Sequence, residues 1–586
     1  MSKRKKRRLS SRPSPAKAPA TLVREPVVAP PPSPAPATPA GPTVSTRTVP
    51  RWSIIVVFAV LFLITRLVNL ETYPLHGDEA TYIYWGQIAA SGPEQRFISM
   101  WGGRQPLHTW IVAALVPLVD SILAPARLIS VVAGTLTALG VFLLARKLFS
   151  MRAACVATLL YILSPYTTQF DRQVFQDGMI SAEAIGTLYL TVLTFERPRW
   201  PASIGLGIVI GLALLTKSTS WLFIPLIIFG FLAFPRSEWK SRSIRAAPHL
   251  LVALAMGSAL YYFLFGSSPA AADLGRWASV FTYSIGELLG FPFDAWGNNL
   301  GLIARWLVTY LTLPIFLALL ASLGAMLAWL TRPDAQARAN QATDQPTRTY
   351  GRKLLLVAIW SIVPTLAHVI LAKGLYARYI VFVMPPLLIL VAALIDYIAT
   401  RLAHQPAFSH VKPPHLLAGL VALLIAVPAY QTAMLVFAPQ NFNFDVADRD
   451  PYYDRALWAR VPLAQHLRDT ASGQPVTLLT NFGMDAVLIG ETVSLPYNGQ
   501  SIRLSPLWPV ENGKVYPFDP YTLQPYSPEE IEVMRRERVL YASAPGQEAS
   551  MSAFITPLAD FRDRAGDVQY RLYSIDFERY LAWLSQ

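Results

Sequence analysis

Long apolar runs, separated by short polar and charged segments, make up most of the chain between residues 52 and 437. An apolar helix of about 20 residues can cross a hydrocarbon core about 30 Å thick. The pattern therefore predicts a mainly α-helical, polytopic transmembrane bundle. We predict eleven spans, near residues 52–70, 127–147, 153–170, 178–195, 202–217, 219–235, 248–266, 305–330, 354–372, 378–398 and 415–437.

One further apolar segment, residues 106–124, is short and is interrupted by Pro117. If it crossed the membrane, every later loop would change sides. Without it, the most basic loops fall on the side of the basic N-terminus, as cytoplasmic loops do. Those loops contain Arg146, Lys147, Arg152, Arg197, Arg199, Arg236, Lys240, Arg242, Arg245, Arg332, Arg338, Arg348, Arg352, Lys353, Arg401 and Lys412. We therefore predict that 106–124 lies along the membrane surface and that the N-terminus is cytoplasmic.

The hydropathy falls after Phe437, and residues 438–586 are predicted to form a soluble α/β domain on the extracytoplasmic side. Short stretches rich in β-branched and aromatic residues predict strands. Ser527, Pro528 and Glu530 have the spacing of a helix start, with Ser at the N-cap, Pro at N1 and Glu at N3. The predicted strands are residues 476–480, 486–496, 539–544 and 568–575.

Residues 1–50 begin with a basic cluster and continue as Pro- and Ala-rich sequence without an apolar core. We interpret them as a disordered cytoplasmic tail and not as a cleavable signal peptide. Six of the first eight residues are Lys or Arg, so much of the net charge of +14 is local and does not indicate nucleic-acid binding. Cys155 is the single cysteine, which excludes a disulfide within the chain and a Cys-based metal site.

Two adjacent carboxylates, Asp78 and Glu79, follow the first predicted span by a few residues. Charge so close to the lipid boundary is costly, which makes the pair a functional-site hypothesis. The alternative is that both simply stabilise the N-terminal end of a helix. The predicted topology places a set of charged residues on the same, extracytoplasmic side: Asp78, Glu79, Arg104, Asp171, Arg172, Asp177, Lys217, Lys373 and Arg378.

Several short motifs occur in a fixed order along these outer segments. They are Gly-Asp-Glu-Ala-Thr-Tyr at 77–82, Gly-Arg-Gln-Pro-Leu-His-Thr-Trp at 103–110, Leu-Ser-Pro-Tyr at 163–166 with Phe-Asp-Arg at 170–172 and Asp177, Gly-Leu-Ala-Leu-Leu-Thr-Lys at 211–217, and Tyr-Ala-Arg-Tyr at 376–379 with Pro-Pro at 385–386. Together they resemble the membrane glycosyltransferases of the GT-C fold. The resemblance is to the protein mannosyltransferase and aminoarabinose-transferase group (glycosyltransferase family 39-like), over about residues 52–400.

The resemblance implies an integral-membrane glycosyltransferase, a hexosyl- or pentosyltransferase. It would move a sugar from a polyprenyl-phosphate donor to a protein, lipid or polysaccharide acceptor outside the cytoplasm. Such a transfer needs a base for the acceptor hydroxyl, cations for the leaving phosphate and an apolar groove for the lipid chain. The expected location is the plasma membrane. No cofactor is required by the motifs, although the carboxylates could bind a divalent cation through oxygen.

Residue by residue, the resemblance implies that Asp78 is the base, that Glu79 orients it or contacts sugar, and that Asp177 is a second acidic group for acceptor or metal. Each role has a simpler alternative, such as a solvated loop charge for Asp177. Gly103 stands where some relatives have an acidic residue, which weakens the case for a metal, and Gln105 replaces a family proline.

The basic and aromatic candidates have alternatives of the same kind. Arg104, Arg378, Lys217 and Arg172 are the candidates for phosphate binding, and Tyr82, Tyr376 and Tyr379 are candidates for sugar or acceptor contacts. Arg172 could instead pair with a neighbouring aspartate, Arg378 could extend from a helix end to water, and Lys217 could cap its helix. The aromatic residues could be membrane-interface anchors.

Two other classes of function fit a polytopic protein. A transporter or lipid-linked sugar flippase would have internal repeats and ionisable groups at the membrane midplane. The sequence has no clear repeat, and most charges lie at one face. A non-catalytic scaffold for envelope assembly is the third reading, but it gives no reason for the acidic pair and the Arg-Tyr motif to share one side.

Overall fold

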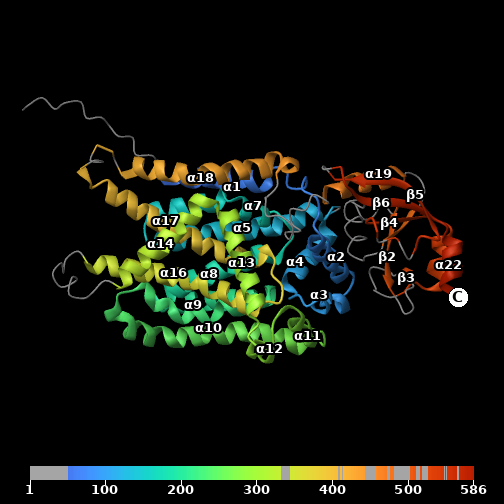
Figure 1. The fold of residues 1–586 in the computed structure, drawn as a ribbon. Coiled ribbons are helices and arrows are strands. Elements are labelled where there is room, and N and C mark those ends of the chain that lie inside the picture. Colours follow the sequence, from blue (N-terminus) through green and yellow to red (C-terminus); the bar gives the residue numbers. More distant parts are fainter. Residues whose placement is uncertain are drawn as a thin grey trace, which may run out of the picture. The chain divides into compact units, whose positions relative to one another are not determined.

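The computed structural model describes residues 51–119, 121–331, 344–406, 410–411, 413–442, 457–470, 476–480, 502–509, 515–517, 525–546, 548, 551–563 and 566–585. The tail predicted for residues 1–50 lies outside the described residues. Most of the described chain up to residue 442 is helical (Figure 1). Its longer helices are α1 (Arg51–Leu67), α2 (Gly77–Ser91), α5 (Leu123–Leu148), α8 (Gln176–Glu196), α9 (Trp200–Thr216), α10 (Trp239–Ser267), α13 (Phe293–Leu311), α14 (Leu313–Thr331), α16 (Asp344–Leu371), α17 (Met384–Leu402) and α18 (Pro413–Phe437).

Shorter helices connect these. They are α3 (Ile98–Trp101), α4 (Leu107–Leu115), α6 (Met151–Ile162), α7 (Pro165–Phe170), α11 (Ala271–Phe281) and α12 (Ile285–Leu289), with 3₁₀ segments η1 (Pro93–Gln95), η2 (Val116–Leu118), η3 (Ser218–Leu222), η4 (Ile224–Ala233), η5 (Arg236–Glu238), η6 (Ala377–Val383) and η8 (Pro439–Asn441).

The polytopic membrane class predicted from hydropathy is confirmed. Seven helices among the described residues are long and apolar enough to cross a membrane, and each overlaps a predicted span. Five apolar helices are shorter: Ser53–Leu67, Leu107–Leu118, Met151–Ile162, Trp200–Thr216 and Ile224–Ala233. Four of these correspond to the remaining predicted spans, and Leu107–Leu118 is the segment predicted to lie at the surface. The number of eleven spans therefore stays a prediction.

Three predicted spans differ in detail from the structure. The segment 305–330 is divided between α13 and α14 at Thr312, whose φ of 66° interrupts helical geometry. The segment 153–170 is divided between α6 and α7, because Ser164 caps α7 and Pro165 occupies its first turn. The segment 219–235 is wound largely as 3₁₀ helix. Local hydropathy predicts burial in lipid but does not reveal such breaks.

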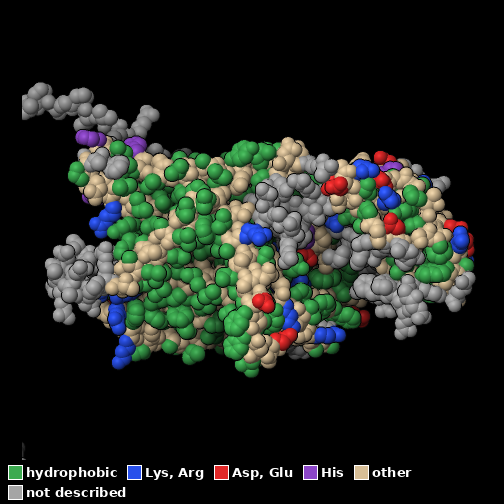
Figure 2. Space-filling model, viewed as in Figure 1, with side chains coloured by type: hydrophobic (Ala, Val, Ile, Leu, Met, Phe, Trp, Pro, Cys, Tyr) green, Lys and Arg blue, Asp and Glu red, His purple; other side chains and the backbone are tan. Residues whose placement is uncertain are grey.

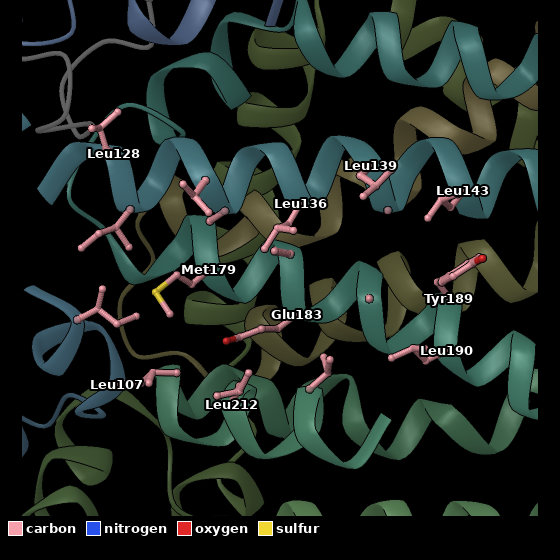
Figure 3. Close-up of a pocket in the computed structure, with 18 of the residues that line it drawn as sticks. Leu107, Leu128, Leu136, Leu139, Leu143, Met179, Glu183, Tyr189, Leu190 and Leu212 are labelled. Atoms are coloured by element: carbon pink, nitrogen blue, oxygen red, sulfur yellow. The ribbon is translucent and has the colours of Figure 1, made fainter. Parts of the chain in front are cut away.

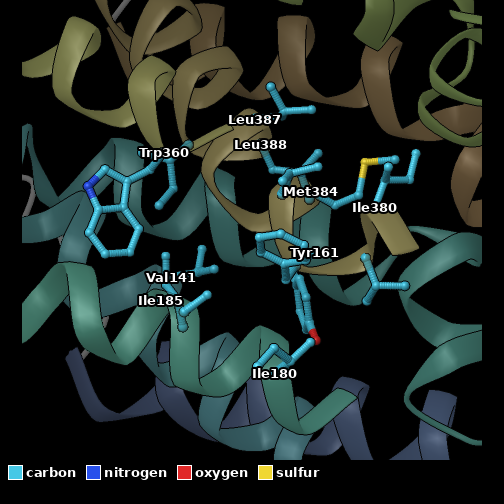
Figure 4. Packing of buried hydrophobic residues seen from close by; sticks show 14 of the residues in the cluster. Val141, Tyr161, Ile180, Ile185, Trp360, Ile380, Met384, Leu387 and Leu388 are labelled. Atoms are coloured by element: carbon cyan, nitrogen blue, oxygen red, sulfur yellow. The ribbon is translucent and has the colours of Figure 1, made fainter. Parts of the chain in front are cut away.

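Helix α17 lies at the centre of the bundle, since 94% of its apolar window is buried inside the protein. Its residues Met384, Leu387 and Leu388 pack near Tyr161 of α6 (Figure 4). On the outside of the bundle, hydrophobic side chains cover much of the visible face, and Lys and Arg side chains are seen towards both of its ends (Figure 2). An apolar belt of this kind matches the environment of a bilayer.

The described part of the C-terminal segment forms a six-stranded sheet with the order β3-β2-β1-β4-β6-β5. β2, β1 and β4 run parallel, whereas β3, β6 and β5 are antiparallel to their neighbours. The strands are β1 (Val476–Thr480), β2 (Ile502–Pro509), β3 (Val515–Pro517), β4 (Arg538–Ser543), β5 (Ile555–Arg562) and β6 (Val568–Ile575), and the helices are α19 (Leu457–Thr470), α21 (Pro528–Arg535) and α22 (Phe577–Ser585).

The α/β character predicted for this segment is confirmed, and three of the predicted strands are β1, β4 and β6. The helix start predicted at Ser527 is also confirmed. Ser527 caps α21, and Glu530 Oε2 accepts a hydrogen bond from the Ser527 backbone N–H. The predicted strand 486–496 lies outside the described residues.

Candidate active site

The first turn of α2 sets the positions of Asp78 and Glu79. His76 is the N-cap residue, and its Nδ1 accepts a hydrogen bond of 3.0 Å from the Asp78 backbone N–H. Glu79 Oε2 accepts a bond of 3.1 Å from the His76 backbone N–H and completes a capping box. Burial lowers the pKa of His76 to about 3, so its ring is neutral and can act as the acceptor. Histidine is a rare N-cap, and the sequence analysis missed it.

Asp78 faces Arg378, which comes from the start of η6. Asp78 Oδ2 lies 2.6 Å from Arg378 Nη1. The Asp78 side chain is 32% exposed, whereas the Arg378 side chain is only 3% exposed. The carboxylate is therefore accessible from outside, and the guanidinium behind it is not.

Arg378 also reaches Asp177, in the first turn of α8. Arg378 Nε lies 3.9 Å from Asp177 Oδ2, and Lys217 Nζ lies 2.5 Å from Asp177 Oδ1. Lys217 directly follows α9. The structure thus brings together four of the predicted residues in an alternating row of charges, Asp78–Arg378–Asp177–Lys217, supplied by four different elements. We call this row the charge cluster.

Arg104 belongs to the same electrostatic environment. Burial opposes ionisation of Asp78, but the positive charges of Arg378 and Arg104 outweigh it and lower the pKa of this carboxyl. Arg104 is placed by a turn in which Gly103 has a φ of 74°. A Cβ at Gly103 would lie 2.5 Å from Trp277 Cβ, so both the backbone conformation and the neighbouring α11 require glycine there.

Aromatic rings surround the cations of the charge cluster. Lys217 Nζ lies 4.6 Å from the ring centre of Tyr379, and the Arg378 guanidinium carbon lies 5.6 Å from the same ring. Tyr376 is 39% exposed and stacks edge-on with Tyr379. Tyr82 is buried, and burial raises the pKa of its hydroxyl. The three predicted tyrosines lie around the cluster, but only Tyr376 is exposed, since Tyr379 is half-buried and Tyr82 is buried.

Glu79 has a different environment from its neighbour. It is fully buried, and its two oxygens each accept a bond of 3.1 Å from the guanidinium of Arg127. Its Oε1 also accepts from the Val174 backbone N–H at 2.8 Å. The remaining Arg127 nitrogen donates to the carbonyls of Leu70 and Tyr73. Glu79 therefore joins α2 to α5 and to the loop before α8.

Arg172 is not part of the charge cluster. Its guanidinium donates to the carbonyl oxygens of Thr65 and Asn69, at 3.0 and 2.7 Å, and so caps the end of α1. The adjacent Asp171 is paired with Arg66 at 3.0 Å, and both side chains are buried. The sequence analysis did not single out Arg66 or Arg127. In the sequence, each of them is only a single arginine near the border of an apolar run.

An apolar groove of about 770 Å³ lies between α5, α8 and α9, with α4 at one end (Figure 3). Its walls are formed almost entirely by aliphatic side chains. Glu183 of α8 is the one Asp, Glu, Lys or Arg in the lining. Because Asp177 and Lys217 stand at the ends of α8 and α9, the groove and the charge cluster share two helices.

The described residues contain no group of three or more His, Cys, Asp or Glu side chains placed to hold a metal ion.

Comparisons with known proteins add independent findings. The family described as dolichyl-phosphate-mannose-protein mannosyltransferase matches residues 104–263, which is less than half of the chain. The crystal structure of ArnT from Cupriavidus metallidurans bound to undecaprenyl phosphate superposes with a TM-score of 0.54 at 14% identity, covering 89% of this chain and 97% of that chain. This chain has the GT-C fold. The apo form of the same ArnT gives a TM-score of 0.53.

A weaker likeness is to the archaeal oligosaccharyltransferase AglB from Archaeoglobus fulgidus, in complex with an inhibitory peptide and a dolichol-phosphate. The TM-score is 0.45 at 14% identity, covering 84% of this chain and 69% of that chain. No curated protein sequence matches this chain. The family match and the ArnT fold together support a membrane glycosyltransferase.

Proposed function

We propose that this protein is an integral-membrane glycosyltransferase that moves a sugar from a polyprenyl-phosphate donor to an acceptor on the extracytoplasmic face. The observation that carries the proposal is the charge cluster, in which Arg378 bridges Asp78 and Asp177 while Lys217 binds Asp177. It combines an accessible carboxylate with buried cations at the end of an apolar groove. The undecaprenyl phosphate bound by ArnT supports a donor of this lipid class.

Arg378, Lys217 and Arg104 form the phosphate site of the proposal. Guanidinium and ammonium groups bind phosphate oxygens by charge-assisted hydrogen bonds. In the structure these cations are paired with carboxylates or with aromatic faces. An arriving phosphate competes for the same donors, so it draws Arg378 away from Asp78 and leaves that carboxylate free to act.

Asp78 is the general base. Its carboxylate takes the proton of the acceptor hydroxyl as the acceptor oxygen attacks the anomeric carbon of the donor sugar. The bond between that carbon and the phosphate oxygen breaks, and polyprenyl phosphate leaves with the bonding electrons, stabilised by the three cations. Attack from the face opposite the phosphate inverts the anomeric configuration.

The other predicted residues receive narrower roles. Asp177 holds Arg378 and Lys217 at the spacing the phosphate needs and contacts the acceptor side of the site. Glu79, locked by Arg127, is a positioning residue for Asp78 through the shared first turn of α2. Tyr376 offers exposed aromatic surface to a sugar, and the half-buried Tyr379 lies beside it. Arg172 is proposed as a positioning residue for α1 and not as a phosphate ligand.

The groove between α5, α8 and α9 is proposed to hold the first isoprene units of the donor, because it is apolar and reaches the helices that carry Asp177 and Lys217. The acceptor is proposed to be a protein, lipid or polysaccharide outside the cytoplasm, guided by the C-terminal α/β domain. The proposed location is the plasma membrane, with residues 1–50 in the cytoplasm.

The experiment that tests the proposal is sugar transfer by purified protein in nanodiscs, with a panel of radiolabelled polyprenyl-phosphate sugars. Wild type should consume or transfer at least one donor. Asp78→Asn should lose about 10²–10⁴-fold in rate, the contribution typical of a general base, while binding of polyprenyl phosphate persists. Equal rates for wild type and Asp78→Asn would remove Asp78 from its role. Movement of lipid-linked sugar across vesicles without any donor turnover would favour a flippase.

A further inference from the structure

Glu183 is unusual because it places a carboxyl group in the otherwise apolar lining of the groove. The side chain is 8% exposed and lies on α8 among aliphatic residues such as Leu136 and Leu212. Burying a carboxyl group in apolar surroundings is costly unless it is paired or hydrogen-bonded. No Lys or Arg of the described chain lies within ion-pair distance of it, so the group is not held as half of a buried salt bridge.

One oxygen of Glu183 is used and the other is not. Oε1 accepts a hydrogen bond of 2.7 Å from the hydroxyl of Thr216. Oε2 is buried and has no hydrogen-bond partner among the described residues. A neutral carboxyl group has one O–H, and with Oε1 occupied as an acceptor this O–H is available at Oε2.

The orientation of Glu183 connects the groove to the charge cluster. Side chains of a helix lean towards its N-terminus, and Figure 3 shows the carboxyl group directed towards the Met179 and Leu107 end of the groove. Asp177 begins the same helix six residues earlier, about 9 Å along the axis. Thr216 directly precedes Lys217, whose ammonium group binds Asp177.

The role of Glu183 depends on which part of a bound lipid lies at this end of the groove. A prenyl chain offers no partner to a hydrogen-bonding group, and the carboxyl group is directed towards the end of α8 that carries Asp177. The phosphate of a lipid at that end accepts hydrogen bonds and is repelled by an ionised carboxylate. A neutral carboxylic acid is suited to this position.

We propose that Glu183, in its neutral form, donates a hydrogen bond from Oε2 to the phosphate of the lipid seated in the groove. It acts as a neutral member of the phosphate site, contributed from the groove side of α8. This inference rests on the proposed function and deepens it, because it assigns a lipid-specificity role to a residue outside the charge cluster. It also explains why one carboxyl group stands in an otherwise apolar wall.

The test compares two substitutions with matched controls. Glu183→Gln keeps a neutral hydrogen-bond donor of the same size, and Glu183→Met removes it while filling the space. Glu196 lies at the other end of α8 and pairs with Lys147 at the surface, so Glu196→Gln and Glu196→Met are the controls. All variants are purified in detergent, and their thermal unfolding and monodispersity are recorded first.

Binding is then measured from the stabilisation given by three probes: polyprenyl phosphate, polyprenol of the same length, and inorganic phosphate. Wild type should prefer polyprenyl phosphate to polyprenol. Glu183→Met should weaken binding of polyprenyl phosphate by about tenfold or more, the usual effect of a hydrogen bond to a charged group, with polyprenol unchanged. Glu183→Gln should stay within about threefold of wild type, and so should both Glu196 variants.

Three outcomes overturn the inference. The first is an unchanged phosphate preference in Glu183→Met, even if that variant is less stable, because Glu183 then only joins α8 to α9. The second is equal loss in Glu183→Gln, because a neutral hydrogen-bond donor of the same size would then fail to replace Glu183. The third is stabilisation by inorganic phosphate as large as that by the lipid. Sugar transfer is measured with the same preparations to distinguish these outcomes from failure of the proposed function. If wild type transfers sugar and Glu183→Met still prefers polyprenyl phosphate to polyprenol, only the role of Glu183 is refuted.

Discussion

Two sets of ion pairs near one end of the bundle use the same residue types and are built differently. The charge cluster joins Asp78, Arg378, Asp177 and Lys217, and its Asp78 side is open to solvent. The inner pairs, Glu79–Arg127 and Asp171–Arg66, are buried, and each guanidinium is also bound to backbone carbonyls. Charge alone does not distinguish the two sets. A charged group whose hydrogen bonds are all made inside the protein stabilises the fold, whereas a group with fewer such bonds can exchange partners.

The contrast is sharpest between Asp78 and Glu79, because they are neighbours in one helical turn. Glu79 accepts bonds from Arg127, from Val174 and from the His76 backbone, so exchange of any partner would leave a buried charge unpaired. Asp78 shares Arg378 with Asp177 and can release it to a ligand. A site that must bind and release phosphate needs the second arrangement.

The largest expected effect is on folding, from the inner set. Arg127→Met leaves Glu79 as an uncompensated buried charge, which typically costs about 3–5 kcal/mol of stability. We expect a large fall in the unfolding temperature in detergent, measured by scanning fluorimetry. Lys147→Met breaks the half-exposed Lys147–Glu196 pair and should change stability by less than about 1 kcal/mol. Equal effects of the two substitutions would break the distinction between the two sets.

The next effect is on donor binding and compares two arginines. Arg378→Met should weaken binding of polyprenyl phosphate by about 10–100-fold, as expected from losing a hydrogen bond to a charged group. Arg172→Met should lower stability, because it uncaps α1, while donor affinity in the folded fraction stays near that of wild type. The check is lipid binding by native mass spectrometry beside thermal unfolding. A selective loss of donor binding in Arg172→Met would instead place that residue in the phosphate site.

The smallest effect concerns the pH dependence of the reaction. The Asp78 pKa is lowered in the folded protein, so the carboxylate is ionised above that pKa and is lost as a base when the pH falls through it. The acid limb of kcat/KM should therefore lie below the usual aspartate value of about 4. In Arg378→Met the limb should move to higher pH by up to about one unit, because the main cation that lowers the pKa is gone. A limb that stays in place would show that Arg378 does not control Asp78.

Some features were available from the sequence because they depend on neighbours along the chain. Apolar runs predicted the membrane bundle, and the Ser527–Glu530 spacing predicted the start of α21. The order of the short motifs predicts the GT-C fold, which the ArnT comparison supports. The same motifs contain Asp78, Asp177, Lys217 and Arg378, which form the charge cluster. Hydropathy and capping are local properties, and motif order survives without knowledge of contacts.

Other features were decided only by the tertiary structure. In the sequence, Asp78 and Glu79 form one acidic pair, and Arg172 and Arg378 are equivalent candidates for phosphate binding. The sequence provides only residue type and predicted position relative to the membrane. Their separation depends on partners far along the chain: Arg127 for Glu79, Arg378 for Asp78 and the end of α1 for Arg172. Glu183 appeared within an apolar run, and only the packing of α5, α8 and α9 placed it in a groove beside Thr216. The order of the charged residues along the chain is a property of the sequence. Which of these residues are buried with their hydrogen bonds made, and which can exchange partners, depends on how the helices pack in the folded protein.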